Sequence, residues 1–306
     1  MRKPGIFRRA DLVRWQARLR SYNRSLLPFE EPLPPTTGND SPRRPVAYRE
    51  EAFLQSPESR PLRFLSEYLW PLAHFRDEKI HDTIVFFGSA RVEENGPLAR
   101  YYREARELAR LLTTWSESLS QPVSPDGVRS HRFVICTGGG PGIMEAANRG
   151  ASEAGGKTIG LNIGLPFEQR PNPYITPELS FEFHYFFMRK FWFAYLAKAL
   201  VVFPGGFGTL DEMTEILTLA QTKKLENKIL ILLYGSEYWH EILNFDALVK
   251  YGMITPEDMN LFGFADSPKD ALRILEDGLT KYYLEPEASM PRSAEEAPEI
   301  AKTRTP

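Results

Sequence analysis

The sequence predicts an α/β fold, in which a doubly wound parallel sheet carries helices on both faces. Short apolar runs of strand length alternate with amphipathic segments of helix length from residue 61 to residue 279, and this alternation is typical of parallel strands joined by helical crossovers. Glycine-rich turns follow three of these runs. In Rossmann-like sheets of this kind, ligands bind beyond the carboxyl ends of the strands, so we expect the three turns to lie together.

The first predicted elements follow from apolar spacing. Apolar residues recur at nearly every third or fourth position over 61–79, which predicts an amphipathic helix that Pro71 interrupts. The polar stretch over 114–130 contains two prolines and predicts a surface insertion. The other segments predict, in order, a strand over 82–87, a helix over 97–113, a strand over 133–136 and a helix over 143–153.

The second half of the chain repeats the alternation. A proline-rich stretch over 164–177 predicts a loop. The apolar run over 199–203 stops at Pro204 and predicts a strand that is buried on both faces. The remaining segments predict strands over 157–163, 179–183, 228–234 and 261–264, and helices over 185–198, from about Leu210 onward, over 237–251 and over 267–279.

Extensions flank the predicted domain at 58–283. Residues 1–27 carry eight Lys or Arg side chains against one acid, and 28–47 contain six prolines, so we expect 1–57 to form a basic arm and a flexible linker. The arm is a plain solvated segment, a contact for nucleic acid or anionic lipid, or an organelle transit peptide, and the sequence leaves these alternatives open. The tail at 284–306 is rich in Glu, Pro, Ala and Ser and is expected to be disordered.

Composition limits the partners. Lys and Arg total 38 against 40 acidic residues, a net charge of −2, which argues against nucleic acid as a partner. The sequence has no apolar run of the roughly 18–20 residues that a membrane span needs, so we expect no membrane partner. The single cysteine, Cys136, excludes an internal disulfide and favours a reducing compartment, the cytoplasm. The five histidines lack metal-ligand spacing, so no metal site is expected.

The strongest functional signal follows the run over 199–203. Gly205, Gly206 and Gly208 permit a tight turn and the close approach of a ligand to the backbone, and Thr209 supplies a hydroxyl at the expected helix start. A strand, a glycine turn and a helix N-terminus in this order predict a phosphate cradle.

Three acids lie within the first turns of the helix that follows. Asp211 and Glu215 either complement the helix dipole or take part in the site, and the sequence leaves both alternatives open. Glu212 lies beside a loop that would hold a phosphate, so we predict a catalytic role for it.

Two further glycine turns are expected at the same edge of the sheet. The first follows the strand over 82–87 and offers backbone N–H groups, a hydroxyl and a guanidinium from Gly88, Ser89 and Arg91. The second follows the strand over 133–136 and consists of Gly138, Gly139 and Gly140.

A cationic pair, Arg189 and Lys190, interrupts an unusually aromatic run over 181–193. The rings themselves are typical of a core helix and a subunit interface. Burying an unpaired cation is costly, so the pair must reach water, a carboxylate or a bound anion. We place Arg189 in the site.

Several other motifs are excluded. The segment over 138–143 lacks the third glycine of a dinucleotide fingerprint, and the strand over 157–163 does not end in an acid that could hold a ribose. Gly156-Lys157-Thr158 precedes a strand and therefore is not a P-loop. The sequence contains no Gly-x-Ser-x-Gly elbow and marks no lysine for a Schiff base, so we expect no cofactor.

The residues over 204–212, PGGFGTLDE, resemble the PGGxGTxxE signature of the LONELY GUY family, the cytokinin-activating phosphoribohydrolases often labelled as lysine decarboxylases. The tripeptide Met188-Arg189-Lys190 is similar to the upstream arginine element of that family, and 137–145 resembles its first glycine-rich turn. The resemblance covers about residues 80–235. Residues 1–60, the insertion and the tail depart from the shorter plant-type enzymes.

The resemblance implies that the N-glycosidic bond of a nucleoside 5′-monophosphate, cytokinin-type or AMP-like, is hydrolysed to free base and ribose 5-phosphate in a homodimer or larger assembly. Glu212 would stabilise the positive charge that develops on the ribose. Arg189 would keep Glu212 ionised, and would either fix the substrate or assist the leaving base. The expected phosphate- and nucleotide-binding residues are Gly88, Ser89, Arg91, Gly138, Gly139, Gly140, Glu145, Met188, Lys190, Pro204, Gly205, Gly206, Gly208 and Thr209.

An alternative function is a non-catalytic nucleotide or cofactor carrier of the same fold. A carrier also binds phosphates through glycine loops, but it has no need of a guanidinium beside a carboxylate. The Arg189–Glu212 pair is therefore the feature that favours the enzyme.

Overall fold

The structure is a computed structural model and describes residues 45–119, 130–164, 170–225 and 228–285. The chain divides into two compact units, Met1–Phe53 and Leu54–Pro306. The basic arm and most of the predicted tail lie outside the described residues. In the first unit, the described residues form a 3-10 turn at Ala47–Arg49 and the start of a short helix, α2, at Glu51–Gln55.

The described residues of the second unit form one sheet of seven strands, all parallel, in the order β4-β3-β2-β1-β5-β6-β7. The predicted α/β fold with a doubly wound parallel sheet is confirmed. The strands are β1 Thr83–Phe87, β2 Val134–Thr137, β3 Thr158–Ile163, β4 Ser180–Phe183, β5 Ala197–Val202, β6 Leu230–Tyr234 and β7 Phe262–Ala265.

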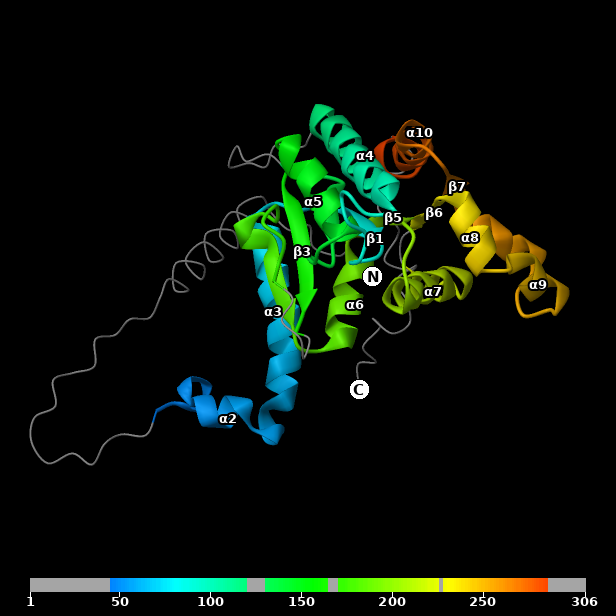
Figure 1. The fold of residues 1–306 in the computed structure, drawn as a ribbon. Coiled ribbons are helices and arrows are strands. Elements are labelled where there is room, and N and C mark those ends of the chain that lie inside the picture. The colour runs from blue at the N-terminus through cyan, green and yellow to red at the C-terminus, as the bar shows by residue number, and fades with distance from the viewer. Residues whose placement is uncertain (1–44, 120–129, 165–169, 226–227, 286–306) are drawn as a thin grey trace, which may run out of the picture. The chain divides into compact units, whose positions relative to one another are not determined.

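Helices connect most of the successive strands and cover the sheet, whereas the described part of the β3–β4 connection contains only a loop and a 3-10 turn (Figure 1). Short 3-10 turns lie at Pro57–Ser59, Pro177–Leu179 and Pro256–Leu261, and a π-helical turn, Thr280–Leu284, ends the described chain. The α-helices are α3 Arg60–Asp77, α4 Ala99–Ser118, α5 Ile143–Glu153, α6 Phe186–Tyr195, α7 Phe207–Gln221, α8 Ser236–Ile242, α9 Phe245–Lys250 and α10 Pro268–Leu279.

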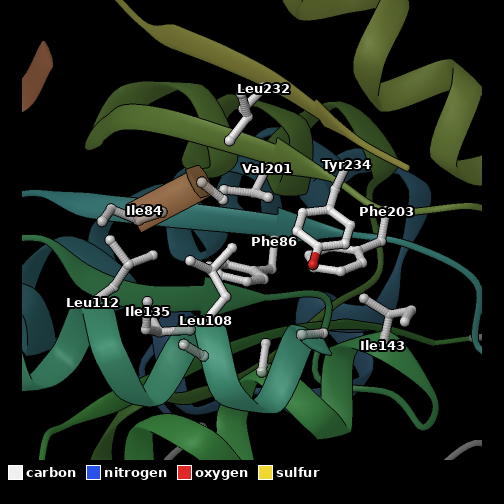
Figure 2. Packing of buried hydrophobic residues seen from close by; sticks show 14 of the residues in the cluster. Ile84, Phe86, Leu108, Leu112, Ile135, Ile143, Val201, Phe203, Leu232 and Tyr234 are labelled. Carbon is white, nitrogen blue, oxygen red and sulfur yellow. The ribbon is translucent and has the colours of Figure 1, made fainter. Parts of the chain in front are cut away.

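Alternate side chains of β1 enter two separate apolar cores. Ile84 and Phe86 pack with α4, α5 and α10 on one face of the sheet, and Figure 2 shows this core from close by. Val85 and Phe87 pack with α3, α6, α7 and α8 on the other face. The sheet is therefore buried on both sides, as expected for parallel strands whose helical connections lie on both faces.

The connections reverse direction between β1 and β5, which are neighbours in the sheet. From β1 the chain moves outward through β2 to β4, and from β5 it moves outward through β6 to β7 in the other direction. In doubly wound sheets, the crevice at such a reversal is the usual place for a ligand. The first and third glycine turns follow β1 and β5 and lie at this crevice.

The start of α7 differs from the prediction. The helix begins at Phe207 and not near Leu210, because the Leu210 N–H already donates to the Gly206 carbonyl at 3.0 Å. Gly208 therefore lies inside the first turn. Thr209 is the third helical residue, and its predicted place at the helix start is wrong; Gly206 holds the cap position.

The end of α6 also differs from the prediction. The helix stops at Tyr195, whereas the prediction extended it to Lys198. Ala197 and Lys198 belong to β5, whose pairing with β1 begins at Thr83 and Ala197. Sheet pairing here overrides the helical pattern of the sequence.

The predicted helix over 61–79 is α3, and Pro71 lies inside it. Two other predicted boundaries are corrected. The helix α4 extends to Ser118, so the first residues of the predicted insertion at 114–130 are helical, and 120–129 lie outside the described residues. The predicted helix over 237–251 is two helices, because the side chain of Asn244 accepts a hydrogen bond from the Ala247 N–H at 2.9 Å and starts α9.

Candidate active site

Backbone hydrogen bonds join the three glycine turns. The Ser89 N–H of the first turn donates to the Pro204 carbonyl of the third at 3.0 Å, and the Ile143 N–H, which follows the second turn, donates to the Ser89 carbonyl at 3.1 Å. The first turn thus lies between the other two and is bonded to both. The sequence predicted this gathering from the parallel order of the strands.

The first turn is held by close packing and by its own hydroxyl. A Cβ at Gly88 would lie 2.6 Å from the Ile143 side chain, so only glycine fits between β1 and α5. The Ser89 hydroxyl accepts a hydrogen bond from the Arg91 N–H at 3.1 Å. The Arg91 residue itself is exposed.

The second turn is buried and contains backbone conformations that glycine adopts more easily than other residues. Gly139 and Gly142 have φ angles of 73° and 71°, a left-handed region that side chains disfavour. A Cβ at Gly139 would overlap the Asn162 side chain, and one at Gly142 would overlap the Ser89 carbonyl. Gly138 lies directly against the guanidinium of Arg189, where a Cβ would be 2.5 Å from Nη2.

Asn172 clamps the second turn from the loop before β4. Its side-chain amide donates to the carbonyls of Gly139 and Gly140, both at 3.1 Å, and its backbone N–H donates to Gly139 at 2.8 Å. The same amide donates to Asn148 Oδ1 at 2.9 Å. Thr137 also donates to Asn148 Oδ1, at 2.6 Å, and its hydroxyl accepts from the Gly139 N–H at 2.9 Å.

Sequence reasoning did not identify these asparagines. Asn172 lies in a proline-rich loop and Asn148 lies inside a helix, where neither has a motif that marks it. Asn162 is the penultimate residue of β3, near the carboxyl edge of the sheet, and that position was the one available signal.

The third turn is buried at its start and open at its tip. Gly205 packs so closely against the Thr209 side chain that a Cβ would overlap the hydroxyl, and its carbonyl accepts a hydrogen bond from the Tyr238 hydroxyl at 2.8 Å. Gly206 and Gly208 are exposed, and a Cβ at either would meet no described atom within 4 Å. The helix α7 begins here without a side-chain cap from any described residue. Its first N–H groups therefore have no intrahelical partner and favour an anion.

The Arg189 side chain contacts both the second turn and α7. Its Nε donates to the Leu161 carbonyl at 2.7 Å, and its Nη1 lies 3.5 Å from Glu212 Oε1. The guanidinium also lies over the Phe193 ring, 4.9 Å from the centroid. Its side chain is 13% exposed. The two predicted catalytic residues therefore form a pair beside the glycine turns, although they come from different helices.

Burial controls the protonation of Glu212. The residue is 7% exposed, and burial raises the pKa of its carboxyl to about 7. The cations Arg189 and Lys190 lower this pKa, while the neighbouring acids Glu215 and Asp211 raise it. Arg189 thus lowers the pKa of Glu212, which is the direction that the sequence predicted. Burial raises this pKa by more than Arg189 lowers it.

Three predicted binding residues have partners within the protein. Lys190 Nζ lies 2.8 Å from Asp211 Oδ2 and 2.8 Å from Glu215 Oε2, so its ammonium joins α6 to the two acids that flank Glu212 on α7. Glu145 accepts a hydrogen bond from the Tyr102 hydroxyl of α4 at 2.9 Å. The partly buried Met188 packs against the core beneath α6.

Neither a metal site nor a membrane helix is found in the described part of the chain. These residues contain no group of three or more His, Cys, Asp or Glu side chains that could hold a metal ion. None of the helices in the same residues is long and apolar enough to cross a membrane. Cys136 is fully buried, and burial raises the pKa of its thiol.

Comparison with known proteins finds one matching family model and several similar phosphoribohydrolases. The model of a family described as possible lysine decarboxylase matches residues 144–275. Cytokinin riboside 5′-monophosphate phosphoribohydrolase LOG1 of Arabidopsis thaliana is 30% identical over 153 residues, which cover 49% of this chain and 70% of that protein. The probable phosphoribohydrolase LOGL2 of Oryza sativa subsp. japonica is 28% identical over 147 residues, covering 47% of this chain and 59% of the rice protein.

Solved structures of molybdenum cofactor proteins are also similar. The molybdenum cofactor binding protein of Rippkaea orientalis is 17% identical with a TM-score of 0.43, and the match covers 64% of this chain and 96% of that one. The molybdenum cofactor carrier protein of Chlamydomonas reinhardtii is 22% identical with a TM-score of 0.43, and the match covers 65% and 99% of the two chains.

Proposed function

The chain belongs to the LONELY GUY family of cytokinin riboside 5′-monophosphate phosphoribohydrolases, and from that premise we propose that it hydrolyses the N-glycosidic bond of nucleoside 5′-monophosphates. The substrate is AMP, a similar nucleotide or a cytokinin nucleotide, and the products are the free base and ribose 5-phosphate. The observation that carries the proposal is the buried Arg189–Glu212 pair beside three joined glycine turns.

The third turn suits the 5′-phosphate. The backbone at Gly206 and Gly208 is exposed, so a phosphate can approach it without meeting a side chain. The uncapped first turn of α7 presents N–H groups to the same place, and a helix N-terminus favours negative charge. Glu212 lies one turn further along α7 from this end, a distance that suits a ribose between the phosphate and the carboxylate.

Glu212 is the residue proposed to act on the sugar. As the bond between C1′ and the base nitrogen breaks, its electron pair leaves with the base and positive charge develops on the ribose. The ionised carboxylate stabilises that charge and accepts a proton from the water that attacks C1′, whose oxygen forms the new bond to C1′. The departing base nitrogen takes up one proton, and Glu212 releases the one it accepted, so the products are the free base and ribose 5-phosphate. A pKa of about 7 suits this exchange of a proton near neutral pH.

Arg189 has two compatible tasks. Its attraction for Glu212 favours the ionised carboxylate. Its Nη2 lies against Gly138, its Nε donates to the Leu161 carbonyl, and its Nη1 lies nearest to Glu212. From there, the guanidinium either fixes an oxygen of the substrate or assists the departing base.

The same proposal includes a homodimer working in the cytoplasm. The helix α6 carries large apolar side chains that are exposed in a single chain, including Phe186, Phe187 and Phe191, and such a patch is typical of a protein interface. The single buried cysteine suits a reducing compartment. Light scattering on the purified protein should give the mass of two or more chains, and the mass of one chain would contradict the dimer.

The experiment that tests the activity compares the wild-type protein with Glu212→Gln. Each is incubated with AMP, GMP, CMP and isopentenyl-AMP, and the released base is measured by chromatography while nucleotide binding is measured by calorimetry. We expect the wild type to release base from at least one nucleotide and the variant to bind that nucleotide with little release. Binding of nucleotide by the wild type without release of any base would contradict the enzyme and support a carrier.

A further inference from the structure

The helix α6, which carries Arg189, is capped by a carboxylate from a distant helix. None of the residues that the structure describes in or next to the N-cap of α6 supplies a side-chain cap from within. Instead, Glu67 of α3 accepts two backbone hydrogen bonds there, from the His184 N–H at 2.8 Å and from the Tyr185 N–H at 3.2 Å. A carboxylate at this end of a helix satisfies free N–H groups and complements the helix dipole.

We propose that Glu67 is a positioning residue for the active site, which acts by fixing the first turn of α6 so that Arg189 reaches Glu212. Glu67 touches neither residue of the pair directly. It lies outside the segment 144–275 that the family model matches, so this role would belong to the helix that precedes the sheet. The proposal rests on the proposed function only where turnover is used as a readout.

A short chain of bonds leads from Glu67 to Arg189. The Tyr185 N–H donates to Glu67, and the Tyr185 carbonyl accepts from the N–H groups of Met188, at 3.1 Å, and Arg189, at 3.2 Å. Arg189 is thus only one helical turn from the capped end. If the cap is lost, the first turn frays, and the guanidinium loses the fixed position from which it reaches Glu212.

Other contacts keep α6 packed on α3 when the Glu67 side chain is changed. The Trp192 indole N–H donates to the backbone carbonyl of Glu67 at 2.9 Å, which survives substitution. Arg63 Nε donates to the Tyr185 hydroxyl at 3.2 Å, and the Phe64 and Tyr185 rings lie 4.4 Å apart at their centroids. Loss of the carboxylate should therefore loosen the start of α6 without releasing the whole helix.

The test compares Glu67→Gln with a matched control, Glu78→Gln. Glu78 is the C-cap residue of α3, at the C-terminal end of the same helix, and its Oε2 lies 2.6 Å from Lys157 Nζ. We expect turnover of AMP, or of the nucleotide that the wild type cleaves fastest, to fall about 10- to 100-fold in Glu67→Gln, since a displacement of about 1 Å at a catalytic group has effects of this size. The control should stay within about twofold of the wild type.

The pH dependence provides a readout that a purely structural role would not move. The charged groups facing Glu212 are Arg189 and Lys190 from α6, and Asp211 and Glu215 from its own helix. Because Arg189 lowers the pKa of Glu212, its displacement should move the rising limb of the rate profile to higher pH in Glu67→Gln. The limb of Glu78→Gln should coincide with that of the wild type.

Hydrogen exchange provides a readout that does not depend on activity. In Glu67→Gln, the backbone amides over 184–189 should exchange faster than in the wild type, while those of the control should not change. Faster exchange together with lower turnover supports the proposal. Unchanged exchange, or faster exchange with wild-type turnover and pH profile, overturns it. If the wild type cleaves no nucleotide, the proposed function fails, and the exchange rates together with the Arg189–Glu212 distance in a crystal structure of Glu67→Gln still decide the positioning role.

Discussion

The second and third glycine turns look alike in the sequence but are built differently. The second turn is buried, and its carbonyls at Gly139 and Gly140 are taken by the Asn172 side chain. The third turn has one such contact, from Tyr238 to Gly205, and its tip at Gly206 is exposed.

The difference separates support from binding. A turn whose polar groups are already bonded inside the protein has little left to offer a ligand, whereas an exposed turn at an uncapped helix can bind one. In the function proposed here, the second turn is a supporting wall that lies against Arg189 at Gly138, and the third turn holds the phosphate. Changes at the two turns should affect different properties of the protein.

The largest expected effect is on the helix that follows the exposed third turn. Glu212→Gln should lower kcat by about 10² to 10³, the usual cost of removing one well-placed electrostatic group, while leaving the fold intact. Asp211→Asn is the matched control, because Asp211 is the adjacent acid but its side chain is 59% exposed. Steady-state kinetics with the nucleotide that the wild type cleaves fastest measure kcat of both variants. An equal fall of kcat in both would show that the negative charge of the region matters, and not the position of the Glu212 carboxylate.

The next effect distinguishes the two turns by adding one methyl group to each. Gly139→Ala forces a left-handed conformation and overlaps Asn162, so it should lower the free energy of unfolding by about 3 kcal/mol. Gly206→Ala meets no described atom within 4 Å, so stability should change by less than about 0.5 kcal/mol, while KM rises because the methyl group occupies the phosphate site. Denaturant unfolding and kinetics measure both. The reverse pattern would mean that the second turn is the binding turn.

A smaller loss of stability is expected when the Asn172 side chain is removed. Asn172→Ala leaves the buried carbonyls of Gly139 and Gly140 without their side-chain donor, which should cost about 2 kcal/mol. Turnover per folded molecule should fall less than in Glu212→Gln, because Asn172 supports the wall without touching the substrate. Thermal unfolding combined with an active-site titration separates the two quantities. A collapse of kcat at unchanged stability would instead make Asn172 a ligand of the substrate.

The smallest expected effect is a shift of the pH profile. The rate should rise with pH through about 7, because the proposed function requires the ionised form of Glu212 and burial raises the pKa of its carboxyl to about 7. Lys190→Met removes a charge that lowers this pKa, so the rising limb should move to higher pH, and Glu215→Gln removes a charge that raises it, so the limb should move to lower pH. Rate profiles of the two variants check the opposite signs. Shifts in the same direction would assign the limb to another group.

The sequence predicted the features that depend on local pattern. The alternation of apolar runs placed each strand to within a few residues, and the glycines after 82–87, 133–136 and 199–203 marked the edge where the turns meet. The sequence also placed Arg189 in the site, because a cation in an aromatic run must reach water, a carboxylate or an anion. Its pairing with Glu212 came from the family resemblance.

What the sequence did not predict depends on contacts between distant segments. Asn172 and Asn148 act across 24 positions, and Glu67 caps a helix more than 100 positions away. Their side chains follow no local period, so no pattern marks them. The end of α6 at Tyr195 was missed for a related reason, since pairing of β5 with β1 decides it.

The measurement that tests the account most directly is a crystal structure of Glu212→Gln with bound AMP. We expect the phosphate at the third turn, within hydrogen-bond distance of the N–H groups of Phe207, Gly208 and Thr209, with C1′ of the ribose facing residue 212. A phosphate bound at the second turn, or a ribose turned away from residue 212, would contradict it.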